Sequence, residues 1–440
     1  MGVMIVSLLT KTLGPAMEFR QYRIFWLGTL ASVTGFQMLN FSQFWIIHRL
    51  TQDPLFLGYV GLASAVPSIL LNLFGGVVAD KLDRKRLIAF TQSINAILIL
   101  ILALITFTEV VRPTHVIILA FLAGGVNAFD QPARQALYPA LIDRSVMMNA
   151  VALNSAIWTG TRIIAPAIAG VVITVAGEGT SFLLSALGFL AMSIITLTIH
   201  VPKTNKRNSH NIAERSEGAR KALFEGVKYI FANNIFLFLI AITFFNSFFG
   251  MAYLPMMPVF AVEILEVGAD GQGIIMGLGG IGALSMTMVL GRIGNFEKRG
   301  LLIILGSMSF GLTLAIFALT AAWISSYYLA MVLMLIIGAS SSAYMISIMS
   351  SLQLMVPDNM RGRVMGFYGI TWSIMPLGGM YAGGLAKLIG DTNDGVPIAV
   401  AVGGLLVALF ALGPSLLNSN IRNLGKLVAD VDAQHARQTS

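Results

Sequence analysis

Long apolar stretches account for most of this chain, and their length is the feature that most limits how the chain can fold. Twelve of them, separated by charged or turn-forming residues, lie at approximately 23–48, 58–80, 87–108, 114–137, 147–175, 180–200, 234–261, 270–292, 301–321, 324–349, 363–389 and 396–416. A helix needs about 20 apolar residues to cross the hydrocarbon core of a bilayer, whereas the strands of a membrane barrel alternate over about ten. The sequence therefore predicts an all-α membrane protein with twelve transmembrane helices.

The composition agrees with a chain that lies mostly inside a lipid bilayer. Only 11% of the 440 residues are charged, whereas about a quarter of the residues of a soluble protein are charged. Cysteine is absent, which excludes disulfide frameworks and thiolate metal sites. The five histidines are scattered without the spacing of metal ligands, so we expect no metal site.

The basic residues are distributed unevenly between the two sides of the membrane. Loops numbered alternately from a cytoplasmic N-terminus place most of the 28 Lys and Arg on the cytoplasmic side; Arg49, Arg112 and Lys387 fall on the other side and Arg162 falls inside a span. This asymmetry follows the positive-inside rule. We therefore expect both termini in the cytoplasm, a bacterial-type inner membrane, and a net charge of +8 that reflects topology rather than nucleic-acid binding.

The longest polar stretch divides the chain into two halves that resemble each other. We expect a cytoplasmic N-terminal segment at 1–21 that is not a cleaved signal sequence, a six-helix half at 22–200, a cytoplasmic central loop at 201–232, a second six-helix half at 233–416 and a cytoplasmic tail at 417–440. A shift of about 215 positions aligns Gly76 with Gly291, Arg84 with Arg299 and Asp143 with Asp358. Two halves repeated in the same orientation are typical of twelve-helix secondary transporters.

Motifs for ATP hydrolysis and cofactor chemistry do not occur in an interpretable context. The chain has no GxxxxGK[ST] phosphate loop, so we expect neither ATP nor a bound cofactor. The sequence GLGGIG, with Gly277, Gly279 and Gly282, matches a dinucleotide fingerprint but lies inside an apolar span with no preceding strand. These glycines are better interpreted as sites of close helix approach. The sequence thus predicts a protein that is not an enzyme.

The loop after the second span carries the strongest local motif. It reads GVVADKLDRKRLI and contains Gly76, Asp80, Arg84 and Lys85. This spacing resembles the signature between helices two and three of the major facilitator superfamily, although Lys81 and Asp83 depart from the usual arginine and glycine. The resemblance implies that Asp80 pairs with basic or helix-terminal groups of the opposite half and helps to close the cytoplasmic side. The alternative is a solvated basic loop that only follows the positive-inside rule.

A second resemblance indicates the direction of transport. The segments FDQPARQALYPALIDRSVMMNAVALNS, TRIIAPAIAG and VPDNMRGRVMGFYG look like the branch of that superfamily that contains macrolide-efflux proteins and the enterobactin exporter. GTRIIAPAIAG, with Gly160, Pro166 and Gly170, is similar to the fifth-helix signature of exporters, with Ala165 in place of a glycine. This resemblance implies the major facilitator fold and export rather than uptake.

Two charges lie deep in the predicted spans. A charge at the centre of a span costs from about 3 to more than 10 kcal/mol if it faces lipid, so Arg162 should face the bundle interior. The one acid at comparable depth is Asp130, and we expect it to pair with Arg162. The alternative is a local bridge with Arg134, one helical turn further on, although Pro132 lies between the two residues. As the only deep carboxylate, Asp130 is also the candidate for proton coupling; the alternative is a purely structural charge pair.

Polar side chains in the middle of two spans are candidates for the substrate cavity. In the first span they are Gln37, Asn40 and Gln43; in the seventh, Asn246 and Tyr253 share a face with Phe249. Each alone is more often an interhelical hydrogen bond than a ligand contact. The many Met and Phe residues favour a bulky amphipathic substrate over sugars or compact ions.

Together these observations predict a monomeric alternating-access exporter in the lipid bilayer. Its substrate would be a lipophilic or amphipathic small molecule of the drug or siderophore class, and the proton gradient would be its energy source. One alternative is an uptake carrier or facilitator for a metabolite. Another is a membrane receptor or scaffold without transport, which needs neither the repeat nor an intramembrane charge.

Overall fold

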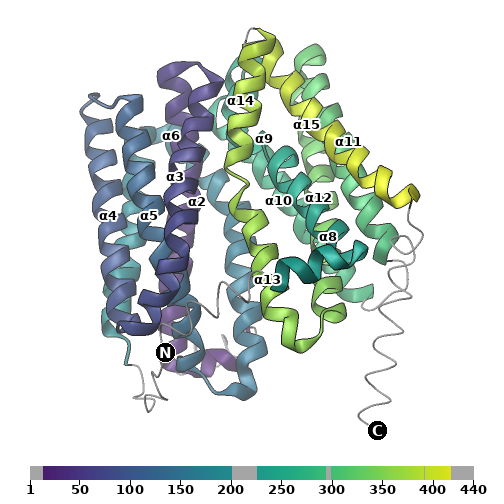
Figure 1. Ribbon diagram of the computed structural model, residues 1–440. Coiled ribbons are helices and arrows are strands. Elements are labelled where there is room, and N and C mark those ends of the chain that lie inside the picture. The colour runs from purple at the N-terminus through teal and green to yellow at the C-terminus, as the bar shows by residue number, and fades with distance from the viewer. Residues whose placement is uncertain (1–12, 201–224, 294–298, 391, 418–440) are drawn as a thin grey trace. The chain divides into compact units, whose positions relative to one another are not determined.

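The computed structural model describes residues 13–200, 225–293, 299–390 and 392–417. Within these ranges every regular element is a helix and no strand occurs, as Figure 1 shows. The predicted all-α fold is therefore confirmed.

The first part of the chain forms five long helices that end close to the predicted span boundaries. After a short 3-10 turn, η1 (Pro15–Glu18), come α2 (Arg20–Thr51), α3 (Pro54–Lys81), α4 (Arg84–Phe107), α5 (Pro113–Leu137) and α6 (Met147–Thr198), with the 3-10 turns η2 (Tyr138–Leu141) and η3 (Arg144–Val146) between the last two. Asp53 caps α3 by accepting a bond from the backbone N–H of Leu55, and Pro54 occupies the first helical position, where a missing N–H has no cost.

Helix α6 consists of two legs that meet at Gly177. The backbone there has φ 81° and ψ 167°, a conformation that glycine adopts without steric cost. Ala150 of the first leg and Met192 of the second lie in one hydrophobic cluster with Tyr22, so the second leg returns alongside the first. The predicted fifth and sixth spans are thus the two legs of one helical hairpin.

The remaining helices include several interruptions. A helix covers residues 225–232, and it is followed by α8 (Asn234–Phe245), the π-turn η4 (Asn246–Gly250), α9 (Tyr253–Val259), the π-turn η5 (Phe260–Ile264), α10 (Gly268–Ile293), α11 (Arg299–Ile324), α12 (Tyr327–Met355), α13 (Asp358–Ser373), α14 (Leu377–Ile389) and α15 (Thr392–Leu417). The predicted seventh span is therefore one apolar segment with two π-turns. The predicted eleventh span is broken before Leu377, next to Pro376.

Nine helical segments among the described residues are long and apolar enough to cross a membrane. Three of the twelve predicted spans are not counted separately. Helix α2 is continuous but carries polar residues such as Gln37, Asn40 and Gln43, and it is not among the nine. The second leg of α6 is merged with the first, and α13 and α14 are each short. A multi-pass helical membrane protein is therefore established, and the number twelve stays a prediction.

The chain forms two compact units. The first comprises Met1–Asn205 and Val267–Gly277, and the second comprises Lys206–Glu266 and Leu278–Ser440. In the first unit, a Cβ on Gly124 of α5 would collide with the carbonyl oxygen of Ser64 on α3. In the second, a Cβ on Gly338 of α12 would collide with the carbonyl oxygen of Gly279 on α10. Glycine thus allows the same close helix approach in each unit, which confirms the interpretation of Gly279 as a packing residue.

Candidate functional site

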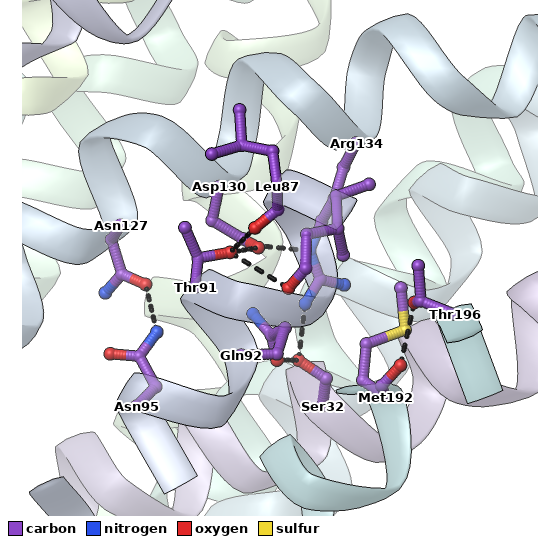
Figure 2. A network of polar contacts seen from close by, with 11 residues as sticks. Ser32, Leu87, Thr91, Gln92, Asn95, Asn127, Asp130, Arg134, Met192 and Thr196 are labelled. Carbon is purple, nitrogen blue, oxygen red and sulfur yellow. Dashed lines mark hydrogen bonds and ion pairs between the residues drawn. The ribbon is translucent and has the colours of Figure 1, made fainter. Parts of the chain in front are cut away.

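A cluster of buried polar side chains lies in the first unit where α2, α4 and α5 meet. Figure 2 shows that its centre is the carboxylate of Asp130 on α5. One oxygen, Oδ2, accepts a bond of 2.5 Å from Nε of Arg134, and Oδ1 lies 2.8 Å from the hydroxyl of Thr91 on α4. The cluster therefore holds a complete ion pair with a hydroxyl beside it.

The guanidinium of Arg134 connects this carboxylate to α2. Its Nη2 donates to the hydroxyl of Ser32 at 2.7 Å, and Ser32 donates in turn to Oε1 of Gln92 at 2.9 Å. Its Nη1 is buried and has no hydrogen-bond partner among the described residues. The network thus ties three helices together, and the two N–H donors of Nη1 remain outside it.

Burial makes this network costly to disturb. Asp130 is 3% exposed and Arg134 is 8% exposed, so both charges are removed from solvent. Moving such ions out of water costs several kcal/mol each, and their mutual attraction offsets this only when the remaining lone pairs and protons are bonded. The bonds from Thr91 and to Ser32 supply that condition on two sides. A change of charge on either partner would therefore be felt by all three helices.

The predicted pairing of Asp130 with Arg162 needs correction. The carboxylate is engaged by Arg134 and Thr91, and the side chain of Arg162 lies exposed on α6. Helix α5 continues through Pro132, so the two residues at positions i and i+4 stay on one face. The structure contains the alternative arrangement, the local ion pair between Asp130 and Arg134.

The motif after the second span lies at the end of α3 and the start of α4. The surroundings of Gly76, Asp80 and Lys81 lie outside what the structure describes. Arg84 donates from Nη1 to the carbonyl of Ala136 at 3.0 Å, which joins the start of α4 to the end of α5. Asp83 caps α4 by accepting bonds from the N–H groups of Lys85 and Arg86. This capping role of Asp83 was not predicted, although an Asp just before a helix is a standard N-cap signal.

The three residues of the fifth-helix motif lie on the first leg of α6 in different surroundings. Gly170 is packed so closely that a Cβ would collide with the carbonyl oxygen of Ala269. Pro166 is buried. Its carbonyl oxygen packs against Gly273 of α10, where a Cβ would collide with it. Gly160 has open space around it, with nothing within 4 Å of a Cβ position.

The predicted cavity residues separate into buried and partly exposed side chains. Gln43, Asn246 and Tyr253 are buried. Asn246 donates to the carbonyl of Ile242 at 2.8 Å and to Ser307 at 3.4 Å, which is an interhelical hydrogen bond. Gln37, Asn40 and Phe249 are half-buried and keep part of their surface available.

Sequence reasoning missed an aromatic cluster in the second unit. Its rings are Phe244, Phe245, Phe248, Phe249, Tyr381 and Phe410. Phe248 and Phe249 lie on the π-turn η4 and contact Tyr381 of α14 with ring centroids 6.0 and 5.0 Å away. Of these six residues only Phe249 was a predicted cavity residue. The sequence of phenylalanines around it does not indicate that Tyr381 of α14 packs against them.

Comparison with known proteins gives a consistent picture. The model of the family described as transmembrane secretion effector matches residues 10–436. The chain is 27% identical to the staphyloferrin A transporter of Staphylococcus aureus, with 79% of this chain and 84% of that protein covered. It is 24% identical to macrolide efflux protein A of Streptococcus pyogenes, with 91% and 96% covered.

Solved structures agree at the level of the fold. The crystal structure of a bacterial homologue of the human lysosomal transporter Spinster superposes with a TM-score of 0.68 and covers 92% of this chain and 98% of that chain. The sequences are 14% identical, so this likeness concerns the fold alone.

Proposed function

The chain belongs to the transmembrane secretion effector family of the major facilitator superfamily and is therefore a membrane transporter and not an enzyme; on this premise we propose that it exports an amphipathic or lipophilic small molecule by alternating access and proton antiport. The observation that carries the proposal is the buried Asp130 of the first unit, within a network that joins three helices. The names of the two relatives, a transporter of staphyloferrin A and a macrolide efflux protein, support the drug or siderophore class.

In the proposed mechanism Asp130 carries the proton. When its carboxylate is ionised, Arg134 holds it and Ser32 holds the guanidinium, so α2, α4 and α5 are tied together. Protonation removes the negative charge and with it the attraction to Arg134. The guanidinium must then find other acceptors, and its Nη1 already lacks one. A proton on Asp130 thus loosens the contact between helices of the first unit.

The motif residues have supporting parts in this proposal. Gly76, Asp80, Arg84 and Lys85 would close the cytoplasmic end, and the bond from Arg84 to Ala136 gives that end a fixed point on α5. Gly160, Pro166 and Gly170 would shape α6, and Gln37, Asn40 and Phe249 would contact the substrate. Both termini would lie in the cytoplasm, and the protein would act as a monomer without ATP or a bound cofactor.

Inverted membrane vesicles with an acidified lumen and an internal pH-sensitive dye test the proposal. A macrolide and staphyloferrin A, the compounds named for the two relatives, are added outside. An exporter carries the compound into the lumen and protons out, so the luminal pH should rise after addition. Compound uptake that continues unchanged with an uncoupler would contradict proton coupling. Compound movement only in right-side-out vesicles would indicate the alternative, an uptake carrier.

The variant Asp130→Asn tests the residue that carries the coupling. It keeps the shape of the side chain and cannot ionise, so we expect membrane insertion without compound-dependent proton release. Asp143→Asn is the matched control, because Asp143 is exposed in a loop. Equal proton release by the two variants would show that Asp130 has only a packing role.

A further inference from the structure

Arg162 lies at the midpoint of a membrane-spanning leg. Met147, where α6 begins, and Gly177, where its legs meet, are each fifteen positions away. At 1.5 Å per residue the guanidinium side chain starts about 22 Å from either end of the leg. The hydrocarbon core of a bilayer is about 30 Å thick, so a side chain at the middle of a leg that crosses it lies within the core.

The side chain of Arg162 is exposed, and the exposed apolar residues that follow it on the same leg point to another side of the helix. The exposed apolar residues nearby include Ile164 and Val171. At 100° per residue they lie about 160° and 180° around the helix from Arg162. An exposed cation on the lipid side would cost from about 3 to more than 10 kcal/mol, so Arg162 faces a polar or water-filled space.

Aromatic and amide groups lie at the same level of the first unit. Trp158 is one helical turn before Arg162, is half-buried, and contacts the ring of Phe36 on α2 with a centroid distance of 6.1 Å. The half-buried amides Gln37 and Asn40 follow Phe36 on α2. Gly160, between Trp158 and Arg162, leaves open space on α6. The contact between Trp158 and Phe36 therefore brings α2 next to the turn of α6 that precedes Arg162.

We propose that Arg162 binds an anionic group, a carboxylate, of the exported compound, and that Trp158 and Phe36 contact its apolar part. A guanidinium presents five N–H donors in a planar fork that matches a carboxylate, so it can bind an anion in addition to its contacts within the protein. Asp130 does not compete for this role, because Arg134 and Thr91 engage both of its oxygens. The substrate is then an anionic amphiphile, a class that the transport proposal leaves open and on which this assignment rests.

Binding of 4-bromobenzoate to purified protein in lipid nanodiscs tests the assignment without transport. Bromine quenches tryptophan fluorescence on contact, and the neutral 4-bromobenzamide has nearly the same size and shape. We expect saturable quenching by 4-bromobenzoate and much weaker quenching by the amide. The variant Trp158→Phe should remove most of the specific signal, which locates the probe.

Variants of the cation complete the test. Arg162→Gln should weaken 4-bromobenzoate binding about tenfold or more, because a charge-assisted hydrogen bond is lost. Arg162→Lys keeps the charge without the planar fork and should lose less. Arg49→Gln is the matched control, since Arg49 pairs with Glu178 at the end of α2.

Three results would overturn the assignment: no saturable quenching in the unmodified protein, equal affinity for the acid and the amide, or unchanged affinity in Arg162→Gln. If Arg162→Gln does not fold, the comparison of acid with amide and the Arg162→Lys variant decide. Vesicles that move no compound while Arg162-dependent binding persists would contradict the transport proposal and not this one.

Discussion

Within each unit, helices approach each other closely at a glycine, yet the two units differ at the positions of Asp130 and Arg134. Positions shifted by 215 place Met345, Met349 and Gly306 of the second unit opposite Asp130, Arg134 and Thr91 of the first. The equivalents of Ser32 and Gln92 are Ser247 and Ser307. Among the described residues of the second unit, Asn246 donates to Ser307 there at 3.4 Å, and both side chains are neutral. An ion pair in one unit thus corresponds to methionines in the other.

Packing, in contrast, is shared. Gly124 of α5 packs against the carbonyl oxygen of Ser64, and Gly338 of α12 packs against that of Gly279. Ser64 and Gly279 are also related by 215 positions. The repeat therefore determines where helices cross, and the side chains at each crossing determine what a unit does. In the proposed mechanism the first unit responds to protons, and the second unit contains the aromatic cluster around Phe248 and Phe249.

The largest difference between the units is expected for Arg134→Met. It leaves the buried carboxylate of Asp130 without its ionic partner, which typically lowers the free energy of unfolding by about 3–5 kcal/mol. The matched variant Met349→Leu keeps apolar volume at the equivalent position and should cost less than about 1.5 kcal/mol. Chemical unfolding of the purified protein measures both.

A double variant sharpens this prediction. Asp130→Leu combined with Arg134→Met removes both charges, so most of the stability lost in Arg134→Met should return. A double variant as unstable as Arg134→Met alone would show that the loss has another cause.

A smaller difference is expected between Ser32→Ala and Ser247→Ala. The hydroxyl of Ser32 accepts from the Arg134 guanidinium and donates to Gln92, so its removal should cost about 1.5–3 kcal/mol. The buried hydroxyl of Ser247 has no hydrogen-bond partner among the described residues, so its removal should change the free energy of unfolding little. Equal losses in the two variants would contradict the asymmetry.

The shared packing predicts similar effects in both units. Gly124→Ala and Gly338→Ala each bring a methyl group against a backbone carbonyl, which should cost about 1–3 kcal/mol. Gly160→Ala is the control, because its Cβ meets nothing within 4 Å, and it should leave the unfolding midpoint unchanged or raise it slightly. A harmless Gly338→Ala would mean that α10 and α12 can move apart.

The smallest effects are expected at two partly exposed ion pairs of the described residues, one in each unit. Arg49 pairs with Glu178 at 2.9 Å, and Arg363 pairs with Glu225. Surface pairs contribute about 0–1 kcal/mol and are screened by salt, so Arg49→Gln and Arg363→Gln should cost little, and less at high salt. A loss of several kcal/mol in either variant would indicate that the pair is more buried than its exposure suggests.

The sequence was sufficient to predict the helices and a position of Asp130 away from solvent, because these depend on composition and spacing. The partner of Asp130 was not predictable in the same way. Pro132 seemed to disturb the turn between Asp130 and Arg134, but a proline inside a helix removes a backbone bond without rotating the following residue away. The structure therefore places the i and i+4 side chains together.

The seventh span shows a different limit. An α-helical period puts Asn246, Phe249 and Tyr253 on one face, but η4 inserts an extra residue into the turn that starts at Asn246. After such a π-turn the side chains face a different direction than the period predicts. Asn246 and Tyr253 are therefore buried, while Phe249 keeps part of its surface exposed.

The empty space beside Gly160 has a practical consequence for spectroscopy. Gly384 on α14 is equally open, with nothing within 4 Å of a Cβ position. Because the natural chain contains no cysteine, a cysteine at each of these glycines would be the only thiols available to a spin label. One label would then report from each unit, and their distance distribution, recorded with and without a proton gradient, would follow the two units through the transport cycle.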